Sequence, residues 1–274
     1  MPSPTEISIS QLARLIGLPN APALIDVRTP EDFRADARLI PGSVRRHFGG
    51  VSAWAGGYAG KPVVVQCQRG LELSQGVAAW LRHEGSRAET LEGGHEAWAS
   101  AKLPLVPQSK LPPRDAQGRT VWVTRSRPKV DRIACPWLIR RFVDPYAVFL
   151  FVPPAEVAGV AEQFMAAPFD VDDVTWAHRG TNCTFDAMVE DLGLQTEPLL
   201  RLAAIVRGAD TGKPDLVPES AGLLAASLGL SRLYADDLEQ LEAGLALYDA
   251  FYRWCRDAMD EAHANHTVRT GKKK

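Results

Sequence analysis

Short apolar runs in the first hundred residues predict the strands of a sheet. The runs ALIDV (residues 23–27) and VVVQC (63–67) are apolar on successive positions and rich in branched side chains, and a third strand is expected around residues 88–91. Continuous runs of this kind are typical of strands that are covered on both faces.

Helical segments alternate with these strands. Residues 29–36 (TPEDFRAD) resemble a turn and a helix start, and residues 74–85 (SQGVAAWLRHEG) have helical spacing and end in glycine. Ser8 and Gln11 fit a capping box at the start of an earlier helix. Strands that alternate with helices predict an α/β domain, a doubly wound parallel sheet with helices on both faces.

The second half has a different pattern. Proline recurs between Pro104 and Gly118 with little apolar periodicity, which predicts a linker over residues 106–118 between domains at 1–105 and 119–262. Beyond the linker, residues 120–127 and 147–152 resemble strands, and residues 238–259 form the clearest helical pattern. We expect a mostly helical α+β second domain, followed by a disordered basic tail at residues 263–274.

Composition narrows the class of protein. The length of 274 residues suits two domains, and a formal net charge of −2 gives no signal for nucleic acid, so no nucleic-acid partner is expected. No signal peptide and no apolar stretch of about 18 residues is evident, which favours a cytoplasmic protein without a membrane partner. The four cysteines are widely spaced with no CxxC pair, so reduced thiols are expected.

Cys67 is the first candidate for chemistry because it ends an apolar run and a helical segment follows it. If residues 68–74 curl from strand to helix, their amides and the helix dipole favour a thiolate, the reactive form of cysteine, or a bound anion. Gly70 would let this loop close without a Cβ atom. The alternative is a small buried residue that only ends the strand. The residues around Cys67 do not by themselves distinguish a reactive thiol from a structural one.

Three motifs in the first half resemble the rhodanese-homology family. LIDVRTPEDFRADARLIPGSV (24–44) is similar to that family's first strand, helix start and Pro-Gly-Ser loop; Cys67 with its loop follows, and LEGGHEAW (91–98) is similar to its closing segment. The resemblance covers residues 8–105. It implies a rhodanese-like fold in which Cys67 carries a persulfide between a sulfur donor, such as thiosulfate or a persulfide, and a thiol acceptor, with no cofactor.

The same resemblance assigns roles to other residues. The active-site loop would consist of Gln68, Arg69, Gly70, Leu71, Glu72 and Leu73, with Arg69 available to a sulfonate or sulfate. Its short length resembles the sulfur-handling members rather than the related phosphatases, whose loop is one residue longer. Asp26, Arg28 and Glu31 match a signature that we expect to be structural. Glu72 departs from the arginine or serine of many active members, and its charge would repel thiosulfate.

The second half has three groups of polar candidates. Basic side chains crowd one span and would form either a cleft for a small oxyanion such as chromate or a solvated face: Arg125, Arg127, Lys129, Arg132, Arg140 and Arg141, with Asp131 and Cys135 as further candidates in the same span. His178, Cys183 and Asp186 could bind a metal ion, with helix capping or packing as the alternative. Arg207 and Asp210 lie in a segment where a metal or salt-bridge role cannot be separated from turn formation.

This half resembles the C-terminal domain of the chromate-resistance ChrB family over about residues 119–258. The resemblance is carried by RPKVDRIACPWLIRRFVDP (127–145), HRGTNCTFD (178–186), IVRGADT (205–211) and YDAFYRWCR (248–256). It implies a link to chromate and oxidative stress without assigning roles to residues. Longer members carry a different N-terminal half proposed to bind DNA, and that property does not transfer.

Three hypotheses follow. The first is a sulfurtransferase in which Cys67 accepts a sulfane sulfur. The second is a sensor or binding module, in which oxidised or persulfidated Cys67 signals to the second domain or an oxyanion is bound. The third places a metal-dependent detoxification activity in the second domain.

Overall fold

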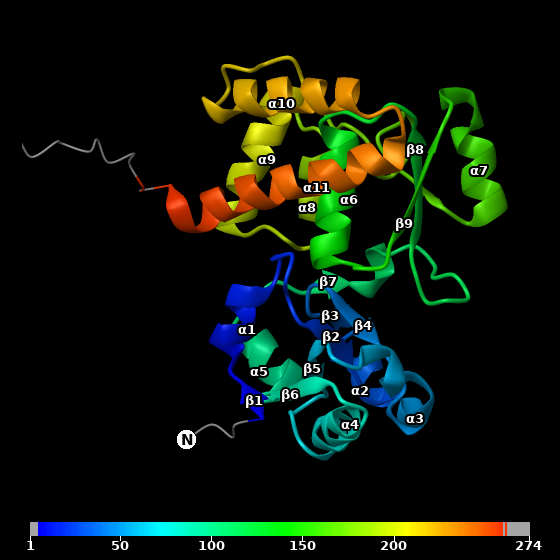
Figure 1. Ribbon diagram of the computed structural model, residues 1–274, viewed down its shortest axis with the longest axis vertical. Coiled ribbons are helices and arrows are strands. Elements are labelled where there is room, and N and C mark those ends of the chain that lie inside the picture. Colours follow the sequence, from blue (N-terminus) through cyan, green and yellow to red (C-terminus); the bar gives the residue numbers. More distant parts are fainter. Residues whose placement is uncertain (1–4, 260, 262–274) are drawn as a thin grey trace, which may run out of the picture.

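The computed structural model describes residues 5–259 and residue 261. The first half of the chain, blue to cyan in Figure 1, lies against the second half, green to red. The basic tail predicted at residues 263–274 lies outside the described residues.

The first half is built on a five-stranded parallel sheet. Its strands are β1 (Glu6–Ile7), β2 (Ala23–Asp26), β4 (Ser43–Arg45), β5 (Pro62–Gln66) and β6 (Arg87–Leu91). Their order across the sheet is β1-β6-β5-β2-β4, and each neighbouring pair is parallel. The structure therefore confirms the parallel sheet and the three strands expected from the apolar runs.

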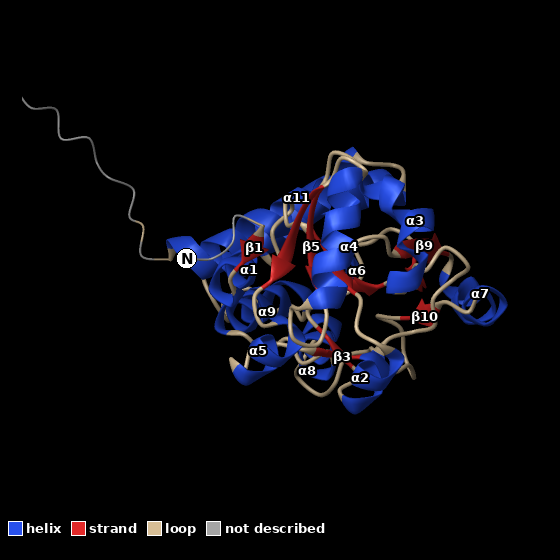
Figure 2. Cartoon of the chain, turned by 90° about the horizontal axis from the view of Figure 1, so that it is seen from below, coloured by secondary structure: helices blue, strands red, loops and turns tan. Residues whose placement is uncertain are grey.

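Helices cover both faces of this sheet. They are α1 (Ile9–Leu15), α2 (Pro30–Ala35), α3 (Val51–Trp54), α4 (Glu72–His83) and α5 (Gly94–Ser100), with 3-10 turns η1 (Phe48–Gly50) and η2 (Ala55–Tyr58). Val63 and Val65 lie in one apolar cluster with Leu81 of α4, whereas Val64 lies in another with Trp98 of α5. Figure 2 shows α4 beside the strands of this sheet, and the alternation along β5 confirms that the sheet is doubly covered.

The predicted capping box is present at α1. The Ser8 hydroxyl accepts a hydrogen bond from the Gln11 amide at 3.2 Å, and the Gln11 side chain accepts one from the Ser8 amide at 2.9 Å. These two bonds satisfy amides that the helix itself leaves unpaired, so the helix begins where the sequence predicts.

The second half is dominated by helices, as predicted, around a small parallel sheet. The strands are β8 (Val121–Arg125), β9 (Val148–Val152) and β10 (Ala167–Pro168), in the order β10-β8-β9. The helices are α6 (Asp131–Phe142), α7 (Val157–Phe164), α8 (Thr184–Asp191), α9 (Glu197–Asp210), α10 (Glu219–Leu233) and α11 (Asp237–Arg253), with a 3-10 turn η4 (Pro154–Glu156). The pattern at residues 238–259 corresponds to α11 and a π-helical turn, η5 (Trp254–Ala258), that continues it.

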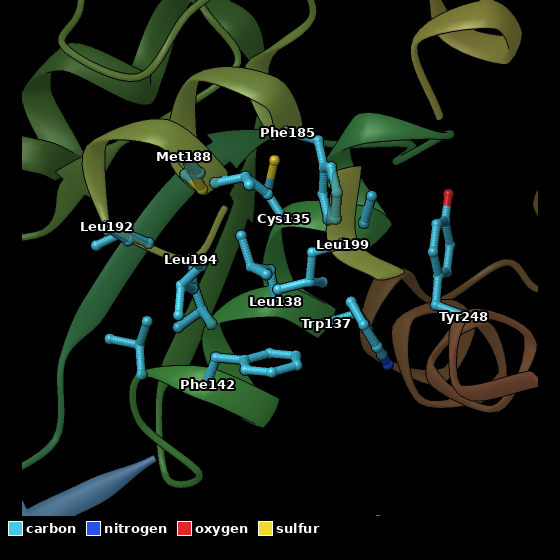
Figure 3. Close-up of a cluster of buried hydrophobic side chains, with 14 of the residues drawn as sticks. Cys135, Trp137, Leu138, Phe142, Phe185, Met188, Leu192, Leu194, Leu199 and Tyr248 are labelled. Atoms are coloured by element: carbon cyan, nitrogen blue, oxygen red, sulfur yellow. The ribbon is translucent and has the colours of Figure 1, made fainter. Parts of the chain in front are cut away.

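Helix α6 forms the centre of the second half. Nine of its twelve residues are buried. The Trp137 ring lies 6.4 Å from that of Phe185 on α8 and 6.3 Å from that of Tyr248 on α11, and Figure 3 shows these side chains gathered around the helix. A helix that is apolar around most of its circumference is stable only in the middle of a core.

The two halves share one apolar core, and α6 reaches the first half through Phe142. The Phe142 carbonyl accepts a hydrogen bond from the Gly42 amide at 2.6 Å. Gly17 has a φ of +81°, and a Cβ atom there would lie 2.4 Å from Cζ of Phe142. The close approach at Gly17 therefore depends on the absence of a side chain.

The segment predicted as a linker, residues 106–118, carries secondary structure. Its first residues form β7 (Val106–Pro107), which pairs antiparallel with β3 (Arg38–Leu39), and a 3-10 turn η3 (Gln108–Lys110) follows. Further along, Arg114 forms an ion pair with Asp144 at 3.1 Å. The proline pattern did not reveal these contacts because they are made with residues far away in the sequence.

Replacing Gly17 by alanine should loosen the junction between the halves. Gly60 is the matched control, because its φ is +74° but a Cβ atom there would meet nothing within 4 Å. Both substitutions carry the cost of a left-handed backbone, and only Gly17→Ala adds overpacking, worth about 1–3 kcal/mol. In urea denaturation, Gly17→Ala should lose that much more free energy of unfolding than Gly60→Ala. Equal losses would contradict the described packing.

Candidate functional sites

Cys67 lies directly after β5, before α4 begins. The residue is 5% exposed, and its Sγ lies 3.3 Å from Oγ of Ser74 on α4. Since the Ser74 hydroxyl donates its own hydrogen to the Leu71 carbonyl at 3.0 Å, it accepts from the thiol. The hydroxyl thus orients the sulfur at the junction between strand and helix.

The backbone around this thiol offers unpaired donors. In the described part of the chain, the amides of residues 68–71 donate to no backbone carbonyl. The first helical bond of α4 runs from the Gln75 amide to the Leu71 carbonyl, so the amides of residues 72–74 have no partner within the helix. Free amides together with the positive end of a helix dipole favour a negative charge nearby.

Helix α5 holds the loop in place. The His95 amide donates to the Cys67 carbonyl and the Glu96 amide to the Gln68 carbonyl, both at 3.0 Å. Gly70 and Gly94 have positive φ angles, and a Cβ atom on Gly94 would lie 2.4 Å from the Cys67 carbonyl oxygen. The glycines therefore allow the loop and α5 to touch through their backbones.

The other side chains of the predicted loop point to a weaker anion site than expected. Gln68 donates to Glu96 at 3.1 Å, and the exposed Arg69 lies 3.6 Å from the same carboxylate. The Glu96 charge therefore partly neutralises that of Arg69. Leu71 is 50% exposed and Glu72 is exposed at the first position of α4, whereas Leu73 packs partly against the cluster that contains Cys67. The free amides are thus the main anion-stabilising groups of this loop.

Asp26 and Arg28 form a buried ion pair at 2.7 Å. Arg28 also donates to the Asp36 and Arg38 carbonyls at 2.9 and 2.7 Å, so this pair ties the end of β2 to the segment after α2. Glu31 does not belong to this group: it is exposed and pairs with Arg34 at 2.8 Å. The three-residue signature therefore splits into a buried pair and a surface carboxylate.

His95 is buried, and no pattern in the sequence marks it as part of the site. Its Nε2 atom lies 3.0 Å from Oδ2 of Asp36, and burial lowers the pKa of this histidine. Because Arg38 donates to Asp36, the pKa of that carboxyl is held well below its usual range. This network fixes the start of α5, which in turn holds the Cys67 loop.

A second polar cluster surrounds His178 in the second half. Its Nε2 atom lies 3.1 Å from Asp210, 3.5 Å from Asp131 and 3.5 Å from Asp170. These carboxylates come from the end of α9, the start of α6 and the segment after β10. In the described residues, the ligand atoms of Asp131, Asp170 and His178 lie within 4.8 Å of one another.

Burial and neighbouring charges shift the pKa values of the groups in this cluster. Burial raises the pKa of Asp131, and burial raises the pKa of Asp210 to about 7. The hydrogen bond to Asp131 and the neighbouring carboxylates raise the pKa of His178 to about 9, so the imidazole is protonated at neutral pH.

Basic groups and a threonine complete this cluster. Arg125 and Arg132 lie 3.2 and 3.3 Å from the Asp170 carboxylate. The Thr184 amide donates to Asp131 at 2.6 Å and its hydroxyl donates to Asp170 at 2.9 Å. The carboxylates are thus positioned by the first turn of α8 and by two arginines.

The other members of the predicted basic cleft lie elsewhere. Arg127 donates to carbonyls at the end of α10, including that of Tyr234 at 3.1 Å, and Lys129 is exposed. Cys135 is fully buried in the core, where burial raises the pKa of its thiol. The expected oxyanion cleft is therefore reduced to two arginines that already contact a carboxylate.

Of the candidate metal ligands His178, Cys183 and Asp186, the structure uses two in a helix cap, because Cys183 and Asp186 cap α8. The Cys183 amide donates to Asp186 at 3.0 Å, and the other Asp186 oxygen accepts from Arg207 at 2.8 Å. This is the capping alternative that the sequence left open. Spacing along the chain missed the observed group because its members meet only through the fold.

Comparison with known proteins defines the class of each half. Residues 8–101 match the family model of the rhodanese-like domain, and residues 122–255 match that of the ChrB C-terminal domain. The chain therefore consists of a rhodanese-like domain followed by a ChrB C-terminal domain. Protein ChrB of Cupriavidus metallidurans is 37% identical over 142 residues, which are 51% of this chain and 42% of that protein. The chain thus spans less than half the length of this curated relative.

Solved structures are similar to part of the chain. A rhodanese-related protein from Thermoplasma volcanium is 22% identical with a TM-score of 0.32, over 37% of this chain and 96% of that one. The thiosulfate sulfurtransferase from Pseudomonas aeruginosa is 25% identical with a TM-score of 0.34, over 40% of this chain and 21% of that one. Among the described residues, no helix has the length and apolar character needed to cross a membrane.

Proposed function

We propose that the rhodanese-like domain forms a persulfide on Cys67 and passes its outer sulfur to an acceptor. The observation that carries this proposal is a thiol at a strand-to-helix junction next to unpaired backbone amides. The two backbone bonds to α5 keep that loop in one conformation, so its donors are oriented before a substrate arrives.

The proposed reaction has two balanced steps. The Cys67 thiolate attacks the outer sulfur of the donor, the donor's S–S bond breaks with its electron pair, and sulfite leaves from thiosulfate or a thiolate leaves from a persulfide. An acceptor thiolate, or cyanide in an assay, then attacks the outer sulfur and releases the Cys67 thiolate. The amides of residues 68–74 would stabilise the negative terminal sulfur between the two steps.

The charges around the loop favour a donor with a small negative charge. Glu72 places an exposed carboxylate at the helix end that would receive the anion, and Glu96 offsets Arg69. Coulomb repulsion of about 1 kcal/mol at 4 Å in water opposes the dianion thiosulfate more than a singly charged persulfide. We therefore propose a low-molecular-weight or protein persulfide as the preferred donor and a thiol as the acceptor.

The ChrB C-terminal domain supports a role of this sulfur chemistry in chromate resistance or oxidative stress. The alternative is a sensor, in which the Cys67 persulfide persists and is read by the second domain through their common core. Turnover separates the two roles, because an enzyme releases the sulfur to an acceptor repeatedly and a sensor retains it.

Mass spectrometry of the intact protein tests the proposal. After incubation with a persulfide donor the protein should gain one sulfur atom, which cyanide removes, and thiosulfate should load it more slowly. Cys67→Ser should gain none, while the buried-thiol control Cys255→Ser should be loaded like the unaltered protein. Loading of Cys67→Ser to the same extent would refute the assignment of the nucleophile.

A second candidate function, a metal-dependent activity of the ChrB C-terminal domain, is favoured by the convergence of His178 with Asp131, Asp170 and Asp210. One imidazole nitrogen and carboxylate oxygens form a donor set that suits Zn²⁺, Fe²⁺ or Mn²⁺. A cation there would replace the proton that now lets His178 neutralise its neighbours.

Metal binding should therefore depend on pH. The protonated imidazole cannot be a ligand, so with the pKa of His178 at about 9, apparent affinity should rise about tenfold per unit between about pH 7 and 8.5 and level off above 9. Calorimetry in two buffers should detect about one proton released per ion at pH 7.5. His178→Gln should abolish binding, whereas the exposed neighbour Asp172→Asn should preserve it. If none of the three ions bound stoichiometrically, a metal-dependent activity of this domain would be excluded.

A further inference from the structure

A hollow of about 450 Å³ lies between the end of β4 and the segment that joins the two domains. Three arginines line it, Arg45 and Arg46 from the end of β4 and Arg114 from the joining segment, and Leu39 and Leu111 contribute apolar walls. It is separate from both polar sites described above, since none of their candidate residues lines it.

Two of these arginines have no acidic partner. Arg114 pairs with Asp144, but no carboxylate of the described residues lies within 4.0 Å of the Arg45 or Arg46 guanidinium. The Nε atoms of both are buried without a hydrogen-bond partner, and burial lowers the pKa of Arg45. Asp26 lies near enough to Arg45 to favour its charged form, but no described carboxylate contacts either guanidinium, so a bound anion would stabilise these partly desolvated cations further.

The remaining contacts leave donors available to a ligand. One Nη atom of Arg45 donates to the Arg28 carbonyl at 3.0 Å, and its guanidinium stacks on the Phe33 ring at 3.7 Å, which holds this side chain still. In the part of the chain that the structure describes, the Arg46 guanidinium makes no hydrogen bond, and its Nη1 atom lies 3.9 Å from where a Cβ on Gly118 would be. One arginine is thus preorganised and the other is free to bind.

The position of the hollow is also typical of a ligand site. The Arg46 amide donates to the Asp26 carbonyl at 3.0 Å, which places these arginines at the carboxyl edge of the parallel sheet. Ligands of doubly wound sheets bind outside this edge. Cys67 directly follows β5, which is two strands from β4, or about 10 Å at the usual strand spacing.

We propose that this hollow binds a tetrahedral oxyanion through Arg45 and Arg46. Guanidinium groups form paired, charge-assisted hydrogen bonds with oxygen atoms of sulfate- or phosphate-like groups, and the joining segment closes the hollow from the other side. The same chemistry is offered by a free inorganic dianion and by the phosphate ester group of a larger molecule. The proposal does not depend on sulfur transfer by Cys67.

Calorimetric titration at low ionic strength with sulfate, and separately with methyl phosphate, tests this site. Sulfate has no sulfane sulfur to transfer and cannot load Cys67, and the Arg46 variants separate binding in this hollow from binding to the free amides of the Cys67 loop. We expect one anion per chain, with Arg46→Gln weakening its binding at least tenfold and Arg46→Lys weakening it less. Arg87→Gln, which removes an exposed charge on β6, is the matched control and should change affinity less than twofold. Tighter binding of sulfate would identify a free inorganic dianion, and tighter binding of methyl phosphate the ester of a larger molecule.

A second measurement places the anion in the unaltered protein. In NMR spectra the Gly118 amide should shift on addition of sulfate, because this residue lies beside Arg46, and the shift should be absent in Arg46→Gln. The proposal would be overturned if neither anion bound, or if Arg46→Gln and Arg87→Gln lost the same amount of anion affinity. It would also be overturned if sulfate bound without a shift of the Gly118 amide.

Discussion

Burial of helix α6 is the constraint on which the arrangement of both halves depends. Its aromatic residues pack against α8 and α11, and Phe142 at its end contacts the first half at Gly17 and Gly42. Its first residue, Asp131, is held among buried groups and supplies a carboxylate to the His178 cluster. One helix therefore joins the domains and also positions the polar centre of the second domain. A change in its packing should alter both the contact between the domains and the His178 cluster.

Features encoded by short segments were predictable from the sequence. The strand before Cys67, the helix after it and Gly70 in the loop between them were all expected, and the structure assembles them as β5, α4 and a loop with a positive φ at Gly70. A capping box at Ser8 is likewise a contact between neighbours in the chain. Local spacing was informative here because backbone conformation and hydrogen bonding between near neighbours determine these features.

Contacts between distant segments were not predictable. His178 meets carboxylates at positions 131, 170 and 210, which no periodic pattern connects, whereas its sequence neighbours Cys183 and Asp186 serve as a helix cap. Glu31 lies close to Arg28 in sequence yet pairs with Arg34 on the surface. Such differences depend on how helices pack and on which face of a helix is buried, and proximity along the chain does not supply that information.

The central claim is that Cys67 is a nucleophile, although all four cysteines are buried. Burial raises the pKa of Cys135, Cys183 and Cys255 thiols, and only Cys67 lies in a loop with unpaired amides. The most direct measurement is alkylation of the native protein with iodoacetamide near neutral pH, with each cysteine quantified by peptide mass spectrometry over time. We expect Cys67 to be modified at least tenfold faster than the other three. Equal rates, or a Cys67 that reacts only after unfolding, would contradict it and identify this thiol as a buried structural residue.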